Sequence, residues 1–190
     1  ANYPYQERSH IAPRLLWVRS FAYIYNPILA LKVLQELLSE YPEAQLSMVG
    51  PFKDDSIEEC KAYAKKNNLP VTFTGGMPKV DWLNYAQDFD IFINTTNVDN
   101  TPVSVIEAMA LGLPVVTTNV GGIPFLLEDE QEALLVPPDD VSAMVNAIRS
   151  LLSSPEKTKS ISQTGRRKVE AFDWEVVKEQ WSGILNSESR

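Results

Sequence analysis

The chain has 190 residues, 44% of them hydrophobic and 22% charged, which is ordinary for a soluble globular chain and leaves ample residues for a core. Seventeen basic and 25 acidic residues give a net charge of −8, which argues against non-specific binding to nucleic acid or anionic membranes. No apolar run approaches the roughly 20 residues of a spanning helix and no signal peptide opens the chain, so we expect a cytoplasmic protein without a transmembrane segment.

The chain contains one histidine, His10, and one cysteine, Cys60. A single cysteine forms no internal disulfide, and these two residues are too few for a zinc site or for a Ser-His-Asp or Cys-His hydrolase. His10 lies in a polar lead-in, residues 1–13, and we expect it to be solvated. This lead-in and the absence of Met at position 1 suggest a fragment of a longer chain.

Short apolar runs alternate with helical patterns along the chain. The predicted strands cover residues 15–18, 44–49, 71–74, 89–93, 115–117 and 133–136. The predicted helices cover residues 27–40, 56–66, 81–87, 102–111, 141–152, 155–171 and 174–186. This alternation predicts an α/β fold, a doubly wound, mostly parallel six-stranded sheet of the Rossmann-like kind with right-handed crossovers.

The stretch from residue 99 to residue 116 is the most informative part of the chain. Residues 99–101 are all types that cap helices, and Pro102 suits the first helical position, so a helix should begin near Pro102. Gly112 should end it after about three turns. Apart from Ser104 and Glu107, residues 103–111 are apolar, which predicts a helix that is buried nearly all round.

An ionised Glu107 on a buried helix needs a protein donor or a polar ligand as its partner. The start of the same helix presents free N–H groups and the positive end of the helix dipole, which is the geometry of an anion site. The alternative is that Ser104 and Glu107 form only a capping box. In that case the helix would begin at residue 105 and have fewer than two turns.

Ligands of doubly wound sheets bind outside the carboxyl ends of the strands. The residues that should lie at this edge are Arg19, Gly50, Gly75, Gly76, residues 94–101 and residues 119–122. Glycines at such an edge allow a ligand to approach the backbone closely, although a glycine after a strand also serves as an ordinary turn residue.

Three segments of the chain carry a resemblance to a known family. They are Asp99-x7-Glu107-Ala-Met-Ala-x-Gly112-x-Pro-Val-Val, Gly121-Gly-Ile-Pro124 and Leu135-Val-Pro-Pro-Asp139. In this order they resemble the C-terminal, donor-binding domain of a retaining GT-B glycosyltransferase of the group 1 (family 4) type. The resemblance extends from about residue 14 to residue 186.

The resemblance implies three parts of the chain. Residues 1–13 would be a lead-in or linker, and residues 14–172 a Rossmann-like domain that binds a nucleotide sugar. Residues 173–190 would form a C-terminal helix that crosses to an N-terminal, acceptor-binding lobe, which is missing from this sequence. Trp174 and Trp181 would then be exposed as the remains of an interface.

The resemblance also implies roles for individual residues. Asp99 would lie near the donor sugar, Glu107 would accept hydrogen bonds from two neighbouring ribose hydroxyls, and Arg19 would bind the phosphates. The implied nucleotide-binding residues are Gly50, Gly75, Gly76, Met77, Thr101, Pro102, Val103, Ser104 and Glu107, of which 75–77 would face the base and the amides of 103 and 104 the diphosphate. The implied catalytic residues are Asp99, Glu107 and Arg19.

The activity that the resemblance implies is transfer of a sugar from a UDP-, GDP- or ADP-type donor to a hydroxyl acceptor, with retention, in glycan or polysaccharide synthesis. The leaving diphosphate would help to take the acceptor proton, and no metal or tightly bound cofactor is implied. We expect this fragment to bind nucleotide but to be nearly inactive without the missing lobe.

The chain departs from the family pattern at several positions. Asp99 stands where glutamate is usual, Val18 where glycine is usual, Phe125 where glutamate is common, and Tyr25-Asn26 where a phosphate-binding Lys-Gly is usual. Half of the expected positive clamp is therefore missing. The alternative is a non-catalytic module that binds nucleotide or docks a partner; a nucleotide-sugar 2-epimerase fits the pair at 99 and 107 poorly.

Two further motifs have simpler interpretations. Asp88-Phe-Asp90 matches the metal-binding D-x-D of another glycosyltransferase fold, but it lies where a helix meets the strand that Phe89 is expected to begin, so we expect no metal role for it. The basic cluster Gly165-Arg-Arg-Lys168 is expected to be a solvated helix face or a contact with the missing lobe.

Overall fold

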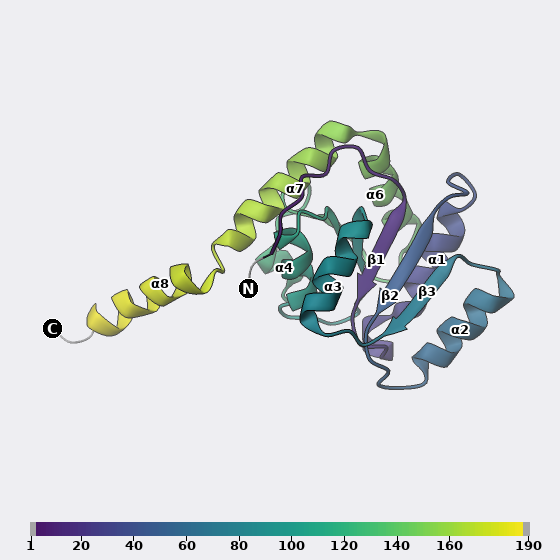
Figure 1. Cartoon of the computed structure of the whole chain (residues 1–190), viewed down its shortest axis with the longest axis horizontal. Helices are drawn as coiled ribbons and strands as arrows, with labels where there is room; N and C mark the ends of the chain where they lie inside the picture. Colours follow the sequence, from purple (N-terminus) through teal and green to yellow (C-terminus); the bar gives the residue numbers. More distant parts are fainter. Residues whose placement is uncertain (1–2, 188–190) are drawn as a thin grey trace.

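The computed structural model describes residues 3–187 and contains one six-stranded sheet (Figure 1). Its strands are β1 (Arg14–Val18), β2 (Gln45–Val49), β3 (Val71–Gly75), β4 (Ile91–Asn94), β5 (Val115–Thr118) and β6 (Leu134–Val136). They lie in the order β3-β2-β1-β4-β5-β6, and every neighbouring pair is parallel. The predicted doubly wound, Rossmann-like fold is confirmed.

Helices cover both faces of this sheet. The helical elements are η1 (Tyr23–Tyr25), α1 (Pro27–Leu37), α2 (Ser56–Lys66), α3 (Lys79–Tyr85), η2 (Ala86–Asp88), α4 (Val103–Ala110), α5 (Ile123–Leu126), α6 (Val141–Ser153), α7 (Pro155–Glu170) and α8 (Trp174–Ser187). On β1, Leu15 and Trp17 join the core under α1, α2 and α6, whereas Leu16 joins the core under α3, α4 and α7. This division follows from the alternation of side chains along a strand.

Helix α4 is shorter than the sequence predicts. It starts at Val103, one residue after Pro102, and its last residue is Ala110, a length of about two turns. Gly112 follows with φ +84°, and a Cβ there would collide with the carbonyl oxygen of Gln6. The helix begins and ends close to the predicted residues, but the prediction of three turns was wrong, because Pro102 and Leu111 are its caps. The capping-box alternative is also wrong, because the helix does not begin at residue 105.

The lead-in from residue 3 to residue 13 packs on the domain. Arg8 is buried, with 4% of its surface exposed, and its guanidinium donates to the carbonyls of Phe89 at 3.2 Å and Leu111 at 2.9 Å. Arg166 of α7 donates to the carbonyls of Ala110 and Tyr3. Two arginines thus satisfy carbonyls at the C-terminal end of α4 and hold the lead-in against it.

The D-x-D motif has a structural role. Strand β4 begins at Ile91 rather than at Phe89, and the carboxylate of Asp90 accepts from Arg14 Nε at 2.6 Å and from the backbone N–H of Ala12 at 3.1 Å. Within residues 3–187, no three Asp, Glu, His or Cys side chains lie together as metal ligands would. Across the same residues, no helix combines the length and apolar character needed to cross a membrane.

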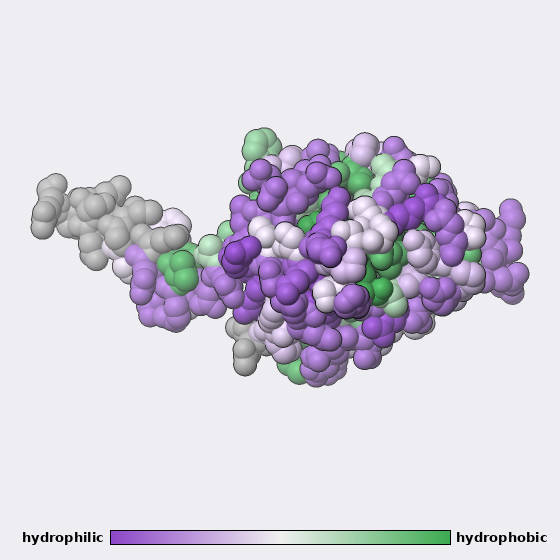
Figure 2. Space-filling view, turned by 90° about the horizontal axis from the view of Figure 1, so that it is seen from above, coloured by the Kyte–Doolittle hydropathy of each residue, from purple (hydrophilic) through white to green (hydrophobic). Residues whose placement is uncertain are grey.

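Helix α8 projects away from the rest of the molecule, and Figure 1 shows it as the yellow arm beyond α7. Trp174 and Trp181 are 66% and 58% exposed, as the sequence predicts. Figure 2 shows a largely polar face on the main body, with green apolar atoms where this arm leaves it.

Candidate functional site

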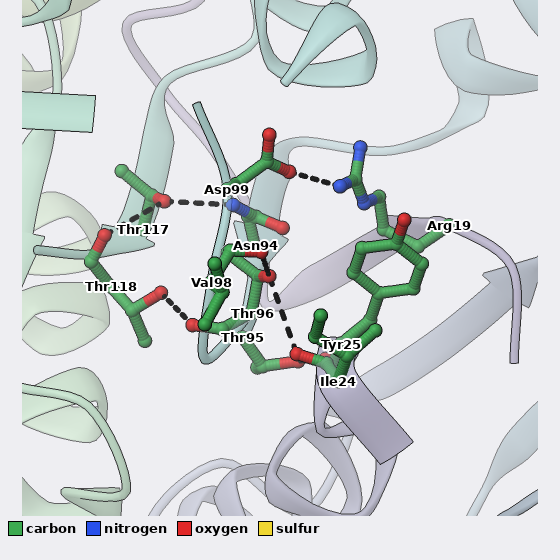
Figure 3. Close-up of polar contacts among 10 residues, drawn as sticks. All are labelled: Arg19, Ile24, Tyr25, Asn94, Thr95, Thr96, Val98, Asp99, Thr117 and Thr118. Carbon is green, nitrogen blue, oxygen red and sulfur yellow. Dashed lines mark hydrogen bonds and ion pairs between the residues drawn. The ribbon is translucent and has the colours of Figure 1, made fainter. Parts of the chain in front are cut away.

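An arginine and an aspartate pair at the carboxyl edge of the sheet. Arg19 follows β1, and Asp99 lies on the loop that follows the neighbouring strand β4. Nη2 of Arg19 donates to Oδ2 of Asp99, and only 16% and 9% of the two side chains are exposed (Figure 3). The structure thus brings together two of the predicted catalytic residues.

The guanidinium of Arg19 has a second neighbour, the ring of Tyr25. Its Cζ lies 4.1 Å from the ring centroid, a cation–π distance. The Nε of Arg19 is buried and has no hydrogen-bond partner within residues 3–187. A buried donor without a partner is costly unless a ligand or water supplies an acceptor.

Buried hydroxyl and amide groups hold the loop between β4 and Asp99 (Figure 3). Asn94 Nδ2 donates to Thr117 Oγ1 at 3.0 Å, and Thr118 Oγ1 donates to the carbonyl of Thr96 at 2.6 Å. Our sequence analysis did not identify this network. Its signal was available, because threonines and asparagines directly follow or end two apolar strands, at residues 94–97 and 117–119.

The second predicted carboxylate, Glu107, lies in a separate cluster. Its Oε1 accepts from Lys79 Nζ at 2.6 Å and from the hydroxyl of Tyr3 at 2.9 Å. Hydrogen bonding to Glu107 and Tyr3 raises the pKa of Lys79, and burial is the main cause that raises the pKa of Tyr3. Glu107 therefore has protein donors, and the sequence analysis missed both of them.

A cleft of about 520 Å³ lies beside this cluster. One wall is the face of α4 that carries Val103, Ile106 and Glu107, and the opposite side includes Arg166 of α7 and Trp174 of α8. A cleft of this volume, lined by both apolar and charged side chains, is large enough for a small organic ligand.

The start of α4 provides further donors. The first amides that bond back within this helix belong to Val105 and Ile106, which both donate to the carbonyl of Pro102. The amides of Val103 and Ser104 thus precede the intrahelical ladder, at the positive end of the helix dipole. The hydroxyl of Ser104 is buried without a hydrogen-bond partner among the described residues.

The glycines at this edge serve two different purposes. A Cβ on Gly50 would collide with the carbonyl of Arg19, and a Cβ on Gly121 with that of Asp99, so these glycines let the loops pack against each other. Gly75 has φ +73° and no atom within 4 Å of an added Cβ. Open space of this kind leaves room for a ligand beside Gly75, and Gly76 and Met77 continue the same turn towards Lys79.

The three predicted catalytic residues therefore fall into two groups. Arg19 and Asp99 form the first, and Glu107 forms the second with Lys79, which was not predicted. Between them lies the start of α4, where Thr101 and Val103 are exposed and Pro102 and Ser104 are buried. This arrangement offers a cation and free amides to an anion, and a carboxylate to a hydroxyl-bearing ligand.

Comparison with known proteins identifies relatives of the whole domain. The model of the family described as "Glycosyl transferases group 1" matches residues 7–168. Sulfoquinovosyl transferase SQD2 of Arabidopsis thaliana is 29% identical over 166 residues, which are 82% of this chain and 31% of that protein. The chain spans less than half the length of the curated relatives that it matches over most of its own length.

Solved structures share the fold. Anabaena HepE, solved in complex with UDP and glucose, superposes with a TM-score of 0.81 at 19% identity and covers 94% of this chain and 49% of HepE. The C-terminal domain of the group 1 protein LpcC from Francisella tularensis has a TM-score of 0.74 at 16% identity and covers 89% of this chain and 94% of that domain. At these identities the likeness shows the fold alone.

Proposed function

The chain belongs to the family of group 1 glycosyltransferases, and on this basis we propose that it is the C-terminal, donor-binding domain of a retaining enzyme of the family 4 type. Its ligand is a nucleoside diphosphate sugar. The observation that carries the proposal is that the free amides that start α4 lie between Asp99, which holds Arg19, and Glu107 along the chain. A cation, a helix start and a carboxylate match a ligand that joins a diphosphate to a ribose.

The diphosphate is assigned to Arg19 and to the start of α4. The unpartnered Nε of Arg19 and the amides of Val103 and Ser104 supply donors for phosphate oxygens. These groups are held in place before the ligand arrives, and they stabilise the negative charge that develops on the leaving diphosphate.

The nucleoside is assigned to the second group. Glu107 accepts hydrogen bonds from two neighbouring ribose hydroxyls, which requires its present donors Lys79 and Tyr3 to share or exchange the carboxylate. Gly75, Gly76 and Met77 lie beside the base. HepE was solved in complex with UDP and glucose, so UDP is the first nucleotide to test.

The proposed reaction breaks the bond between the anomeric carbon of the sugar and the diphosphate oxygen and forms a bond to an acceptor hydroxyl on the same face. The acceptor proton passes to the leaving diphosphate. Asp99 positions the sugar. We further propose that a separate N-terminal lobe binds the acceptor, that the transferred sugar is a hexose, and that the reaction belongs to cytoplasmic glycan or polysaccharide synthesis.

Calorimetric titration of the chain with UDP, GDP and ADP tests the proposal. We expect at least one of these nucleotides to bind, and Glu107→Gln to weaken that binding. Glu58→Gln is the matched control, because Glu58 is exposed on α2 and, within residues 3–187, Lys61 is its only ion-pair partner. A folded sample, checked by circular dichroism, that binds none of the three nucleotides would contradict the proposal.

A second candidate is a domain that binds nucleotide without catalysis. It is favoured by the ion pair of Arg19 with Asp99, which occupies both charged groups that catalysis would use. Sugar transfer or donor hydrolysis by the same chain joined to its acceptor-binding lobe would exclude this candidate.

A further inference from the structure

Tyr25 lies at the end of η1, in the connection between β1 and α1, and contacts the arginine of the site. Its ring faces the guanidinium of Arg19 with 4.1 Å between Cζ and the ring centroid (Figure 3). The ring lies against Cζ of the guanidinium, whereas Asp99 accepts a hydrogen bond from Nη2. The two partners therefore do not compete for the same N–H groups.

The backbone of Tyr25 is fixed to the loop that carries Asp99. Its carbonyl accepts from Thr95 Oγ1 at 2.9 Å, and Thr95 Oγ1 in turn accepts from Trp17 Nε1 at 3.0 Å. Trp17 and Thr95 are fully buried. One residue earlier, the carbonyl of Ile24 accepts from the backbone N–H of Asn97 at 2.9 Å. Both neighbours of the Arg19 guanidinium thus belong to one hydrogen-bonded unit.

The residue after Tyr25 further restricts its position. Asn26 has φ 47° in the left-handed region, where asparagine is better tolerated than most residues, and it precedes the first residue of α1. Its side-chain Nδ2 donates to Asp139 Oδ1 at 2.5 Å and to Asn97 Oδ1 at 3.3 Å. The ring of Tyr25 is therefore presented from a backbone that is anchored on both sides.

We propose that Tyr25 is a positioning residue for Arg19 in diphosphate binding, an inference that rests on the proposed function. A diphosphate that attracts the N–H groups of Arg19 must draw Nη2 away from Asp99. The ring contact uses none of these N–H groups, so it persists during the exchange and keeps the guanidinium plane directed at the phosphates. Arg19 then binds the diphosphate without first losing its orientation, which lowers the entropy cost of binding.

The hydroxyl of Tyr25 is not part of this role. Within residues 3–187 it makes no hydrogen bond, and the bond to Thr95 uses the backbone carbonyl. Tyr25→Phe therefore keeps the ring and serves as the matched control for Tyr25→Leu, which removes the ring but keeps an apolar side chain of moderate size.

Calorimetric titration of the two variants with UDP and UMP tests the proposal. Arg19 lies beside Asp99, which is assigned to the sugar, so it should face the phosphate nearest the sugar, and UMP lacks this phosphate. We expect Tyr25→Leu to weaken UDP binding about tenfold and UMP binding less than about twofold, and Tyr25→Phe to change neither by more than about twofold. If Tyr25→Leu lost affinity for UDP and UMP equally, or lost affinity for neither, the role of Tyr25 would be overturned.

An NMR measurement without nucleotide separates this proposal from the proposed function. The Arg19 Nε–H signal should be displaced by the ring current of Tyr25, retained in Tyr25→Phe and moved in Tyr25→Leu. An unmoved signal in Tyr25→Leu overturns the positioning role even if nucleotides bind. If the unaltered chain binds no nucleotide although the signal moves, the proposed function fails, and the diphosphate role of Tyr25 fails with it.

Discussion

The two carboxylates of residues 99–107 are each paired with a cation, but in different surroundings. Asp99 and Arg19 are both largely buried and come from loops that follow adjacent strands. Glu107 is equally buried, but its partner Lys79 has 52% of its side chain exposed. Its other donor, Tyr3, belongs to the lead-in, 104 residues away in the chain.

This difference predicts different behaviour on ligand binding. A buried pair is strongly destabilising when one partner is removed, because the other charge stays in a poorly solvated place. An ion pair with an exposed lysine contributes little to stability, and the lysine exchanges its partner readily. The pair at Asp99 should therefore stay closed until a ligand supplies Arg19 with another strong acceptor, whereas the pair at Glu107 should open more readily for a ribose.

The largest expected effect is that of Arg19→Met. It leaves Asp99 buried without its partner, so we expect the free energy of unfolding to fall by about 2–3 kcal/mol and UDP binding to fall by about 100-fold. Lys79→Met should lower the free energy of unfolding by less than about 1 kcal/mol. Urea unfolding followed by circular dichroism measures both, and equal losses of stability would remove the contrast between the two pairs.

The next effect is that of Glu107→Gln on nucleotide affinity. The amide keeps the shape of the side chain but replaces one strong acceptor by a donor, so we expect UDP binding to weaken about tenfold or more. Calorimetry with uridine diphosphate measures the change, with Glu58→Gln as the control. An unchanged affinity would mean that the ribose does not contact Glu107.

A smaller effect in the opposite direction is expected for Tyr3→Phe. The change removes one donor that occupies Glu107 Oε1 but keeps the ring, which lies 5.3 Å from Lys79 Nζ. Because the ribose no longer displaces this hydrogen bond, UDP binding should tighten by about threefold. Weaker binding would instead show that the hydroxyl helps to hold the nucleotide.

The smallest effect concerns pH. The contacts with Glu107 and Tyr3 raise the pKa of Lys79 above its ordinary value of 10.5. A cation with a raised folded-state pKa stabilises the fold fully below its unfolded pKa and loses this contribution as the pH rises through the folded value. In urea unfolding at pH 8, the free energy of unfolding of the unaltered chain should exceed that of Lys79→Met by at most about 0.5 kcal/mol. This difference should shrink by about pH 11. An advantage that stays constant across this range would contradict the ion pair.

The fold could be predicted from the sequence because hydrophobic alternation and turn residues are local signals. The placement of Arg19 and Asp99 at one edge was also predicted, since the carboxyl ends of parallel strands meet there, but their ion pair was not. Lys79 and Tyr3 could not be found in this way, because their contact with Glu107 depends on how α3 and the lead-in pack on α4. The length of α4 was overestimated because Pro102 and Leu111 cap the helix instead of belonging to it.

The glycines show a further limit of sequence reasoning. Gly50, Gly75 and Gly121 all follow strands and carry the same local signal. Only the structure separates Gly75, which has open space beside it, from the two that admit neighbouring backbone. Whether Gly75, Gly76 and Met77 contact a base remains a prediction.

The central claim is that a nucleoside diphosphate lies across the start of α4, between the two ion pairs. Titration of the ¹⁵N-labelled chain with UDP, followed by NMR, tests it most directly. We predict shifts of the backbone amides of Val103 and Ser104 together with Arg19 Nε–H. Saturable shifts elsewhere, for example beside Tyr5 and Gln163, with these three signals unmoved would contradict it.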